Sequence, residues 1–190
     1  MAVFEVAKDI DGTTIGHHEC TTTHSAVTFG SVSGGSRISQ AYDHLLLKVS
    51  ARQDGAYDYV NVYITLNGDT GNNYSHTTIR ADSATIETNQ NASRANIHYC
   101  MTPAASATAS TFGAMTIWIP HYTNTSYYKQ MIASSAAENA STASGEWWLN
   151  QTAGLWQSQA AVTQITIDAY ATDDFVANST FDLYGITNNA

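Results

Sequence analysis

The segment YDYVNVYITLNG at residues 57–68 carries apolar side chains at every second position and stops at a glycine turn. Successive side chains of a β-strand point to opposite faces, so this period of two indicates a strand with one dry and one wet face. The rest of the chain repeats the pattern, because short β-branched and aromatic stretches alternate with Gly, Asn, Asp, Ser and Thr and hardly any stretch has a helical period. The sequence therefore predicts an all-β fold.

The composition favours a protein that assembles with other proteins. Charged residues make up 12% of the chain, about half of the roughly 25% in an ordinary soluble protein. A surface rich in hydroxyls and amides suits strands with one wet face, and it lets copies lie side by side without bringing like charges together. The formal net charge is −9, which repels phosphate backbones and anionic lipid, so neither nucleic acid nor a membrane is an expected partner.

Size and termini predict one domain made in a cytoplasm. The chain has 190 residues without a composition break, so we expect a single β-sandwich domain over residues 1–190. The N-terminus has no basic flank, apolar stretch or cleavage site of a signal peptide, and no run approaches the ~18 apolar residues of a membrane span. A cytoplasmic product would keep Cys20 and Cys100 reduced, although whether they pair is open.

The strands are expected to form a two-sheet antiparallel sandwich, most simply a jelly roll. Small residues at 133–144 predict at most a short helical insert, because Ala is the best helix former. The run at 104–110 fits either a short helix or a flexible connection. We expect strands near residues 4–8, 26–29, 45–52, 59–66, 74–80, 96–101, 115–119, 128–133, 146–149, 164–169 and 180–184.

The densest group of potential metal ligands is His17-His18-Glu19-Cys20 followed by His24. A zinc site usually takes two ligands from each of two chain segments, whereas the first four candidates here are consecutive residues, and strand alternation would send neighbours to opposite faces. His18-Glu19 also begins like a metalloprotease helix, but Thr22 stands where the second histidine is needed. We therefore predict no metal ion and no other cofactor.

Catalytic patterns are weak, and we expect no enzyme and no catalytic residue. Asp9 to Gly12 and Asn67 to Asp69 resemble calcium loops but lack the later acidic ligands, so turn chemistry explains them. Glu138 and Glu146 could form a glycosidase pair, but any acidic protein offers such pairs.

Aromatic residues of the second half are the candidates for partner contact. Trp147 and Trp148 are adjacent on an expected strand, so one should face inward and the other outward. Packing in the core or at a subunit interface is favoured for this group, and stacking on glycans is the alternative. The candidate contact residues are Trp147, Trp148, Trp156, Tyr122 and Tyr127.

Five segments, in their order along the chain, resemble a family of small β-rich virion structural proteins of tailed bacteriophages, described as head-decorating or tail-fibre-like. The resemblance runs from Tyr42 to Ile186, and the histidine-rich segment before Tyr42 lies outside it. It brings no catalytic residues to transfer. The segments are YDHLLLKVSAR (42–52), VYITLNGDTGNNY (62–74), IWIPHY (117–122) followed by YYK (127–129), TAGLWQSQAAVTQITI (152–167) and FDLYGI (181–186).

The resemblance implies a non-enzymatic virion protein, made in the host cytoplasm and located in the virion. No heptad, collagen-like repeat or anchoring region precedes the expected domain, so we favour a capsid decoration or cement protein over a long fibre. Its expected partners are further copies of itself, as a homotrimer, and phage capsid or tail proteins. The alternative is a receptor-binding module at the tail or capsid surface that recognises host polysaccharide.

Overall fold

The computed structural model describes residues 2–82, 85–139 and 148–188, and within these ranges the chain is built of β-strands without any helix. Burial alternates along the strands as the period of two predicts; in β9, for example, Gly113, Met115, Ile117 and Ile119 are buried while the residues between them face out. The strands are β1 (Ala2–Val6), β2 (His17–Glu19), β3 (Ala26–Gly30), β4 (His44–Ala51), β5 (Tyr59–Leu66), β6 (Tyr74–Asp82), β7 (Thr85–Arg94), β8 (Ile97–Pro103), β9 (Gly113–Pro120), β10 (Lys129–Ala137), β11 (Trp148–Trp156), β12 (Gln164–Asp168) and β13 (Thr180–Asn188).

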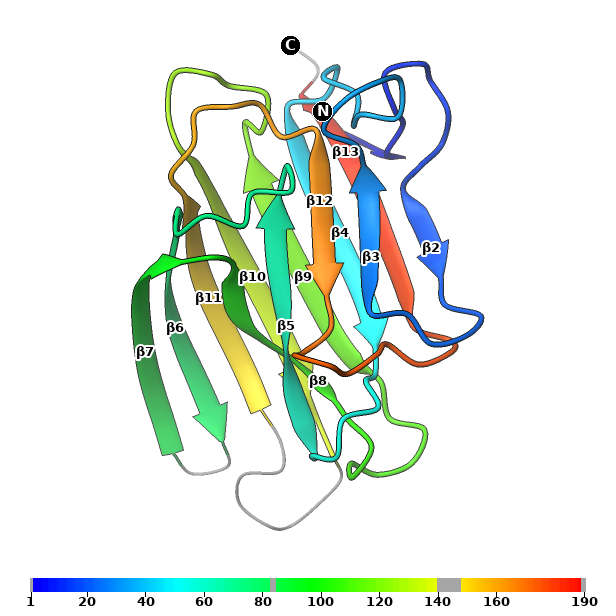
Figure 1. The fold of residues 1–190 in the computed structure, drawn as a ribbon, viewed down its shortest axis with the longest axis vertical. Helices are drawn as coiled ribbons and strands as arrows, with labels where there is room; N and C mark the ends of the chain where they lie inside the picture. Colours follow the sequence, from blue (N-terminus) through cyan, green and yellow to red (C-terminus); the bar gives the residue numbers. More distant parts are fainter. Residues whose placement is uncertain (1, 83–84, 140–147, 189–190) are drawn as a thin grey trace.

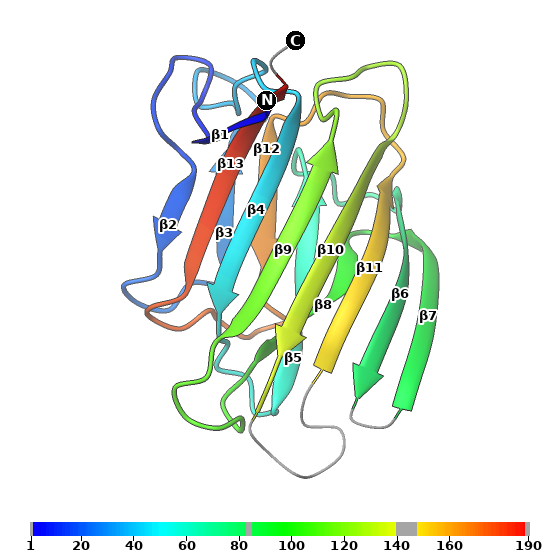
Figure 2. The ribbon, with the colours of Figure 1, turned by 180° about the vertical axis from the view of Figure 1, so that it is seen from behind.

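Two antiparallel sheets pack face to face as an open sandwich (Figures 1 and 2). The larger sheet has the order β1-β13-β4-β9-β10-β11-β6-β7, with β2 also paired to β13, and the smaller sheet has the order β3-β12-β5-β8. Strands β3, β5, β8 and β12 belong to the smaller sheet, and β4, β6, β7 and β9 belong to the larger sheet. The chain therefore crosses between the sheets in the same order as in a jelly roll. The predicted jelly-roll-like sandwich is confirmed.

Two additions enlarge the larger sheet beyond the four strands of a simple jelly roll. The β10–β11 hairpin is inserted between β9 and β6, where a simple jelly roll would pair the two directly, and β13 with β1 and β2 extends the sheet beyond β4. Both additions widen one outer face of the molecule, which Figure 2 shows in front. The smaller sheet covers only part of the opposite face (Figure 1).

The hydrophobic core lies between the sheets and contains the inward side chains of both. Phe175, from the segment before β13, packs edge to face on Phe181 with 4.9 Å between the ring centroids. Each fully buried aliphatic side chain contributes about 1.5–3 kcal/mol. Cys100 also lies in this core, and both cysteines are free thiols. Core aliphatic residues include Leu45, Leu47, Ile64, Leu66, Ile117, Ile165, Ile167 and Leu183.

A helical insert was expected within residues 133–144, and this expectation is wrong for the part of that segment that the structure describes. Ala133 to Ala137 belong to β10, where Ala133 pairs with Ile117 of β9 on one side and Thr152 of β11 on the other. Hydrogen bonding to two neighbouring strands overrides the local helix preference of alanine. Residues 140–144 lie outside the described residues.

Two strands differ from the sequence expectation, and a third segment settles a question that the sequence left open. Strands β2 and β7 were not predicted, because β2 is only three residues long and the polar edge strand β7 has no dry face. Residues 104–110 form an irregular loop instead of a helix. The Arg52 guanidinium holds this loop by donating to the carbonyl oxygens of Ala107 at 3.0 Å and Thr108 at 2.9 Å. In the described ranges no helix is able to cross a membrane.

Candidate functional site

The outer faces of the two sheets differ in chemistry. On the smaller sheet, Thr28 of β3 and Thr65 of β5 flank Thr166 of β12 in register, and the hydroxyl oxygens of Thr28 and Thr166 lie 3.1 Å apart. Thr28 is exposed and Thr166 is partly exposed, so their hydroxyl groups can bind water, whereas Thr65 is buried. The wider outer face of the larger sheet combines a polar row, Asp182, Lys48, Thr116, Ser134 and Gln151, with an apolar row beside it.

One register row crosses the outer face of the larger sheet and is apolar over five neighbouring strands. We call this set the apolar row. Ile132 is 53% exposed and Val6 is 39% exposed, while the three residues between them are partly exposed. Phe4, 59% exposed, extends the apolar surface in the next row. The apolar row consists of Val6 (β1), Tyr184 (β13), Leu46 (β4), Trp118 (β9) and Ile132 (β10), each opposite the next.

A histidine on the same face packs against Trp118, the largest side chain of the apolar row. The imidazole of His44 lies against the Trp118 indole with 4.8 Å between centroids. His44 Nδ1 in turn accepts a hydrogen bond of 3.1 Å from the backbone N–H of His121. Burial, together with the neighbouring His121, lowers the pKa of His44, so this ring stays neutral near pH 7. Trp118 is therefore a rigid aromatic anchor, the residue type that dominates protein interfaces.

Charge is sparse around the apolar row. Among the outward residues of β13, β4, β9 and β10, all of which the structure describes, only Lys48 and Asp182 carry charged groups. Lys48 Nζ lies 5.9 Å from the centroid of the Tyr184 ring, and Asp182 Oδ1 lies 2.6 Å from His17 Nδ1. Lys48 is therefore the cation of these strands that a partner covering the face would have to accommodate, because burying it without a counter-charge would be costly.

Most of the sequence-predicted contact residues lie inside the protein. Trp156 and Tyr122 are buried in the core, and the Tyr122 hydroxyl donates to the carbonyl oxygen of Ser39. The Trp148 ring is buried beneath the Arg80 guanidinium, whose carbon lies 4.5 Å from the ring centroid. Tyr127 is exposed in the loop before β10, and Trp147 lies outside the described residues.

Sequence reasoning missed the residues of the apolar row as contact candidates. The sequence did contain a signal for Trp118. Met115, Ile117 and Ile119 form the buried face of the same strand, so alternation places the Trp118 indole on the outer face. No comparable signal marked Leu46, which stands in a run of three leucines. Only the pairing of strands shows that it lies beside Trp118.

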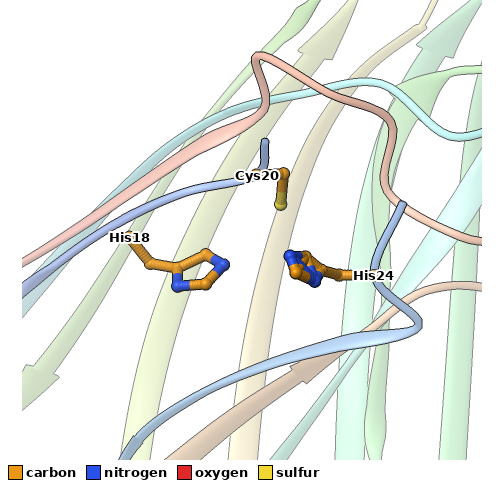
Figure 3. Close-up of side chains that lie close together, drawn as sticks. All are labelled: His18, Cys20 and His24. Carbon is orange, nitrogen blue, oxygen red and sulfur yellow. The ribbon is translucent and has the colours of Figure 1, made fainter. Parts of the chain in front are cut away.

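A second feature is a cluster of His18, Cys20 and His24, whose potential ligand atoms all lie within 4.8 Å of one another. Figure 3 shows the two imidazole rings approaching from either side below the Cys20 sulfur. Strand alternation creates this cluster instead of preventing it: His18 and Cys20 are two residues apart and share a face, while His17 turns outward to Asp182. The chain then returns at His24, which forms a β-bridge with Phe175.

Burial sets the protonation of the cluster. Desolvation lowers the pKa of His18, and the neighbouring His24 and His17 lower it further, so this imidazole is neutral near pH 7. Desolvation also raises the pKa of the Cys20 thiol. His18 Nε2 is buried and has no hydrogen-bond partner among the described residues. A neutral imidazole nitrogen without a hydrogen bond is a potential ligand atom.

The other sequence candidates have ordinary roles or lie outside the described residues. Asp9 Oδ1 accepts backbone hydrogen bonds from Asp11 at 3.0 Å and Thr13 at 2.9 Å, which confirms the turn chemistry expected there. Glu138 is exposed just after β10, and Glu146 lies outside the described residues.

The comparisons with known proteins return nothing: the chain matches no protein-family model, no curated protein and no solved structure.

Proposed function

We propose that this chain is a non-enzymatic structural protein of a bacteriophage virion, which decorates the head and docks on the capsid through the outer face of its larger sheet. The observation that carries the proposal is the apolar row, in which Trp118 lies between Leu46 and Ile132, on a face with few charges. The resemblance to phage virion proteins supports the same choice, because Leu46, Trp118 and Tyr184 all lie within the resembling segments.

The size of the face is adequate for stable docking. Eight strands of about 25 Å, spaced ~4.8 Å apart, offer roughly 900 Å², about one side of a standard protein interface. A protein that binds only the assembled shell stabilises the shell by mass action, since expansion or rupture must first break these contacts. Assembly of the chain as a homotrimer is part of the proposal, and light scattering of the purified protein tests it.

Ile132→Asp tests the docking face, because it places a charge within the apolar row. We expect binding to heads of the encoding phage, prepared without this protein, to weaken at least about 30-fold, the effect of losing roughly 2 kcal/mol at a hot spot. Co-sedimentation over a protein concentration series measures the affinity, and Trp118→Ala should act in the same direction.

Thr28→Asp on the smaller sheet is the matched control for this experiment. It also places Asp at an exposed strand position, but on the opposite face, and should leave binding unchanged. Equal binding by the native protein and Ile132→Asp, or an equal loss in Thr28→Asp, would contradict docking through the larger sheet. Circular dichroism establishes that each variant is folded.

One observation favours the alternative, recognition of host polysaccharide. A surface hollow is lined by Tyr57, Tyr59, Asn61 and Tyr170 together with Val60, and Tyr57 is 63% exposed. Tyrosine rings stack on sugars, and the three tyrosines of this hollow are what favours glycan binding there.

Tyr170→Ala tests the polysaccharide alternative. If the hollow binds glycan, this variant should bind purified host surface polysaccharide at least about 10-fold more weakly than the native protein, since a stacked ring contributes on the order of 1.4 kcal/mol. Tyr128→Ala removes an exposed tyrosine outside the hollow and serves as the control. Absence of polysaccharide binding by the native protein in a calorimetric titration would remove this alternative and leave the docking proposal untouched.

A further inference from the structure

We propose that His18, Cys20 and His24 bind one Zn²⁺ ion, with water completing the coordination. One thiolate and two imidazoles form a ligand set that zinc accepts, through bonds of about 2.3 Å to sulfur and 2.0–2.1 Å to nitrogen. This inference does not depend on the proposed docking function, because the cluster lies in the segment 17–24, outside the resembling part of the chain.

The distances in the cluster are close to those of a zinc site. Tetrahedral ligands at zinc bond lengths lie about 3.3–3.6 Å apart, and the three ligand atoms here lie within 4.8 Å of one another. The most distant pair of ligand atoms would have to approach by at most about 1.2–1.5 Å, a shift that side-chain rotation can supply. Figure 3 shows the His18 ring directed toward His24, with the Cys20 sulfur above the space between them.

The backbone holds all three ligands in place before any ion binds. His18 pairs with Phe181 in β13, and the Cys20 N–H donates to the carbonyl oxygen of Ser179 at 2.8 Å. His24 exchanges two backbone hydrogen bonds with Phe175, at 2.8 and 3.0 Å. Because the ligands are positioned by strand pairing, an ion would gain its bonds with little ordering of the chain.

A second, independent observation indicates a missing partner at this position. The buried Nε2 atom of His18 has no hydrogen-bond partner among the described residues, and buried polar atoms are rarely left so. His18 and His24 are both partly exposed, so water can reach the fourth coordination position. Glu19 is exposed on the opposite side of β2 and is not part of the site.

Metal titration of the whole chain, purified reduced and without a histidine tag, tests the site. After chelator treatment and dialysis against Zn²⁺, elemental analysis should give one zinc per chain, and the unfolding midpoint should rise by roughly 4 °C or more. Co²⁺ in place of Zn²⁺ should show thiolate-to-cobalt charge-transfer absorption, which reports the sulfur bond directly.

Matched variants assign the ligands. Cys20→Ala should abolish the cobalt charge-transfer band, whereas Cys100→Ala, which removes the other buried thiol, should retain it. His24→Gln should weaken zinc binding at least 10-fold, and His17→Gln, which changes the neighbouring outward histidine, should leave it unchanged. Should Cys20→Ala fail to fold, His24→Gln and His17→Gln decide the matter. Substoichiometric zinc in the native protein, or a cobalt band that survives Cys20→Ala, would overturn the proposal.

Discussion

Trp156→Ala is expected to destabilise the protein by about 3–5 kcal/mol, as other large-to-small changes at buried tryptophans do. Trp156 is 2% exposed, and its ring lies nearly parallel to that of Tyr74, with 6.4 Å between centroids. Its indole N–H also donates to Asp69 Oδ2 at 2.7 Å, in the turn between β5 and β6. The change therefore leaves a cavity and frees a turn, and urea unfolding followed by far-UV circular dichroism measures the loss.

Trp156→Phe separates the two contributions, because it keeps an aromatic ring but removes the indole N–H. We expect a smaller loss, about 1–3 kcal/mol, for the hydrogen bond to a carboxylate. Burial alone would raise the pKa of Asp69, but hydrogen bonds from Trp156, Asn73 and the Gly71 N–H outweigh it and lower the pKa. The pKa of Asp69, measured by NMR, should therefore rise in Trp156→Phe. An unchanged pKa together with full stability would contradict this role of the indole.

This result also bears on binding experiments with the tryptophans. A loss of partner binding in Trp156→Ala would follow from the damaged fold, because the ring is not at the surface. Trp118 and Ile132, which lie in the apolar row, are the positions at which binding can be tested without that ambiguity.

Acidification from pH 6.5 to pH 4 is expected to remove several kcal/mol of stability through two buried histidines. His76 of β6 and His98 of β8 pack edge to face with 4.2 Å between ring centroids. Burial lowers the pKa of His76 to about 4, with a further contribution from Arg94. Burial likewise lowers the pKa of His98 to about 4, with contributions from His76 and Arg94.

The direction of the pH effect follows from proton uptake. Unfolded histidines titrate near pH 6.5, whereas both folded pKa values are lower, so between these values the unfolded chain binds more protons than the folded one. The contribution of this pair to the free energy of unfolding is therefore fully present above pH 6.5, and it is lost as the pH decreases toward 4. Each ring accounts for on the order of 3 kcal/mol, and the two titrate as a coupled pair.

Urea unfolding at a series of pH values measures this dependence. His98→Gln should flatten it, because a neutral side chain takes up no proton in either state. Thr77→Gln places the same side chain at an exposed position next to His76 without removing a titratable group, and it should keep the native slope. A native protein whose free energy of unfolding is constant from pH 6.5 to pH 4.5 would show that the pair does not titrate as described.

Much of the fold was predictable because strand periodicity is a local property. The expected strands at residues 45–52, 59–66 and 115–119 match β4, β5 and β9 closely. Segments without that local signal were missed: β7 is polar on both faces, and the alanines of β10 favoured a helix until two neighbouring strands fixed them. The contact candidates were less predictable, because aromatic side chains serve equally in cores and at interfaces.

The amino-acid sequence by itself determined the all-β class and which side of each well-patterned strand is dry, because the direction of a side chain follows from its own strand. Strand pairing decided the rest. It placed Leu46 beside Trp118 and Ile132 on one outer face, enclosed Trp156, and joined His18 to β13 so that Cys20 and His24 lie beside it. These neighbours come from distant parts of the chain, and their hydrogen-bonded register is a property of the assembled sheets that no local pattern contains.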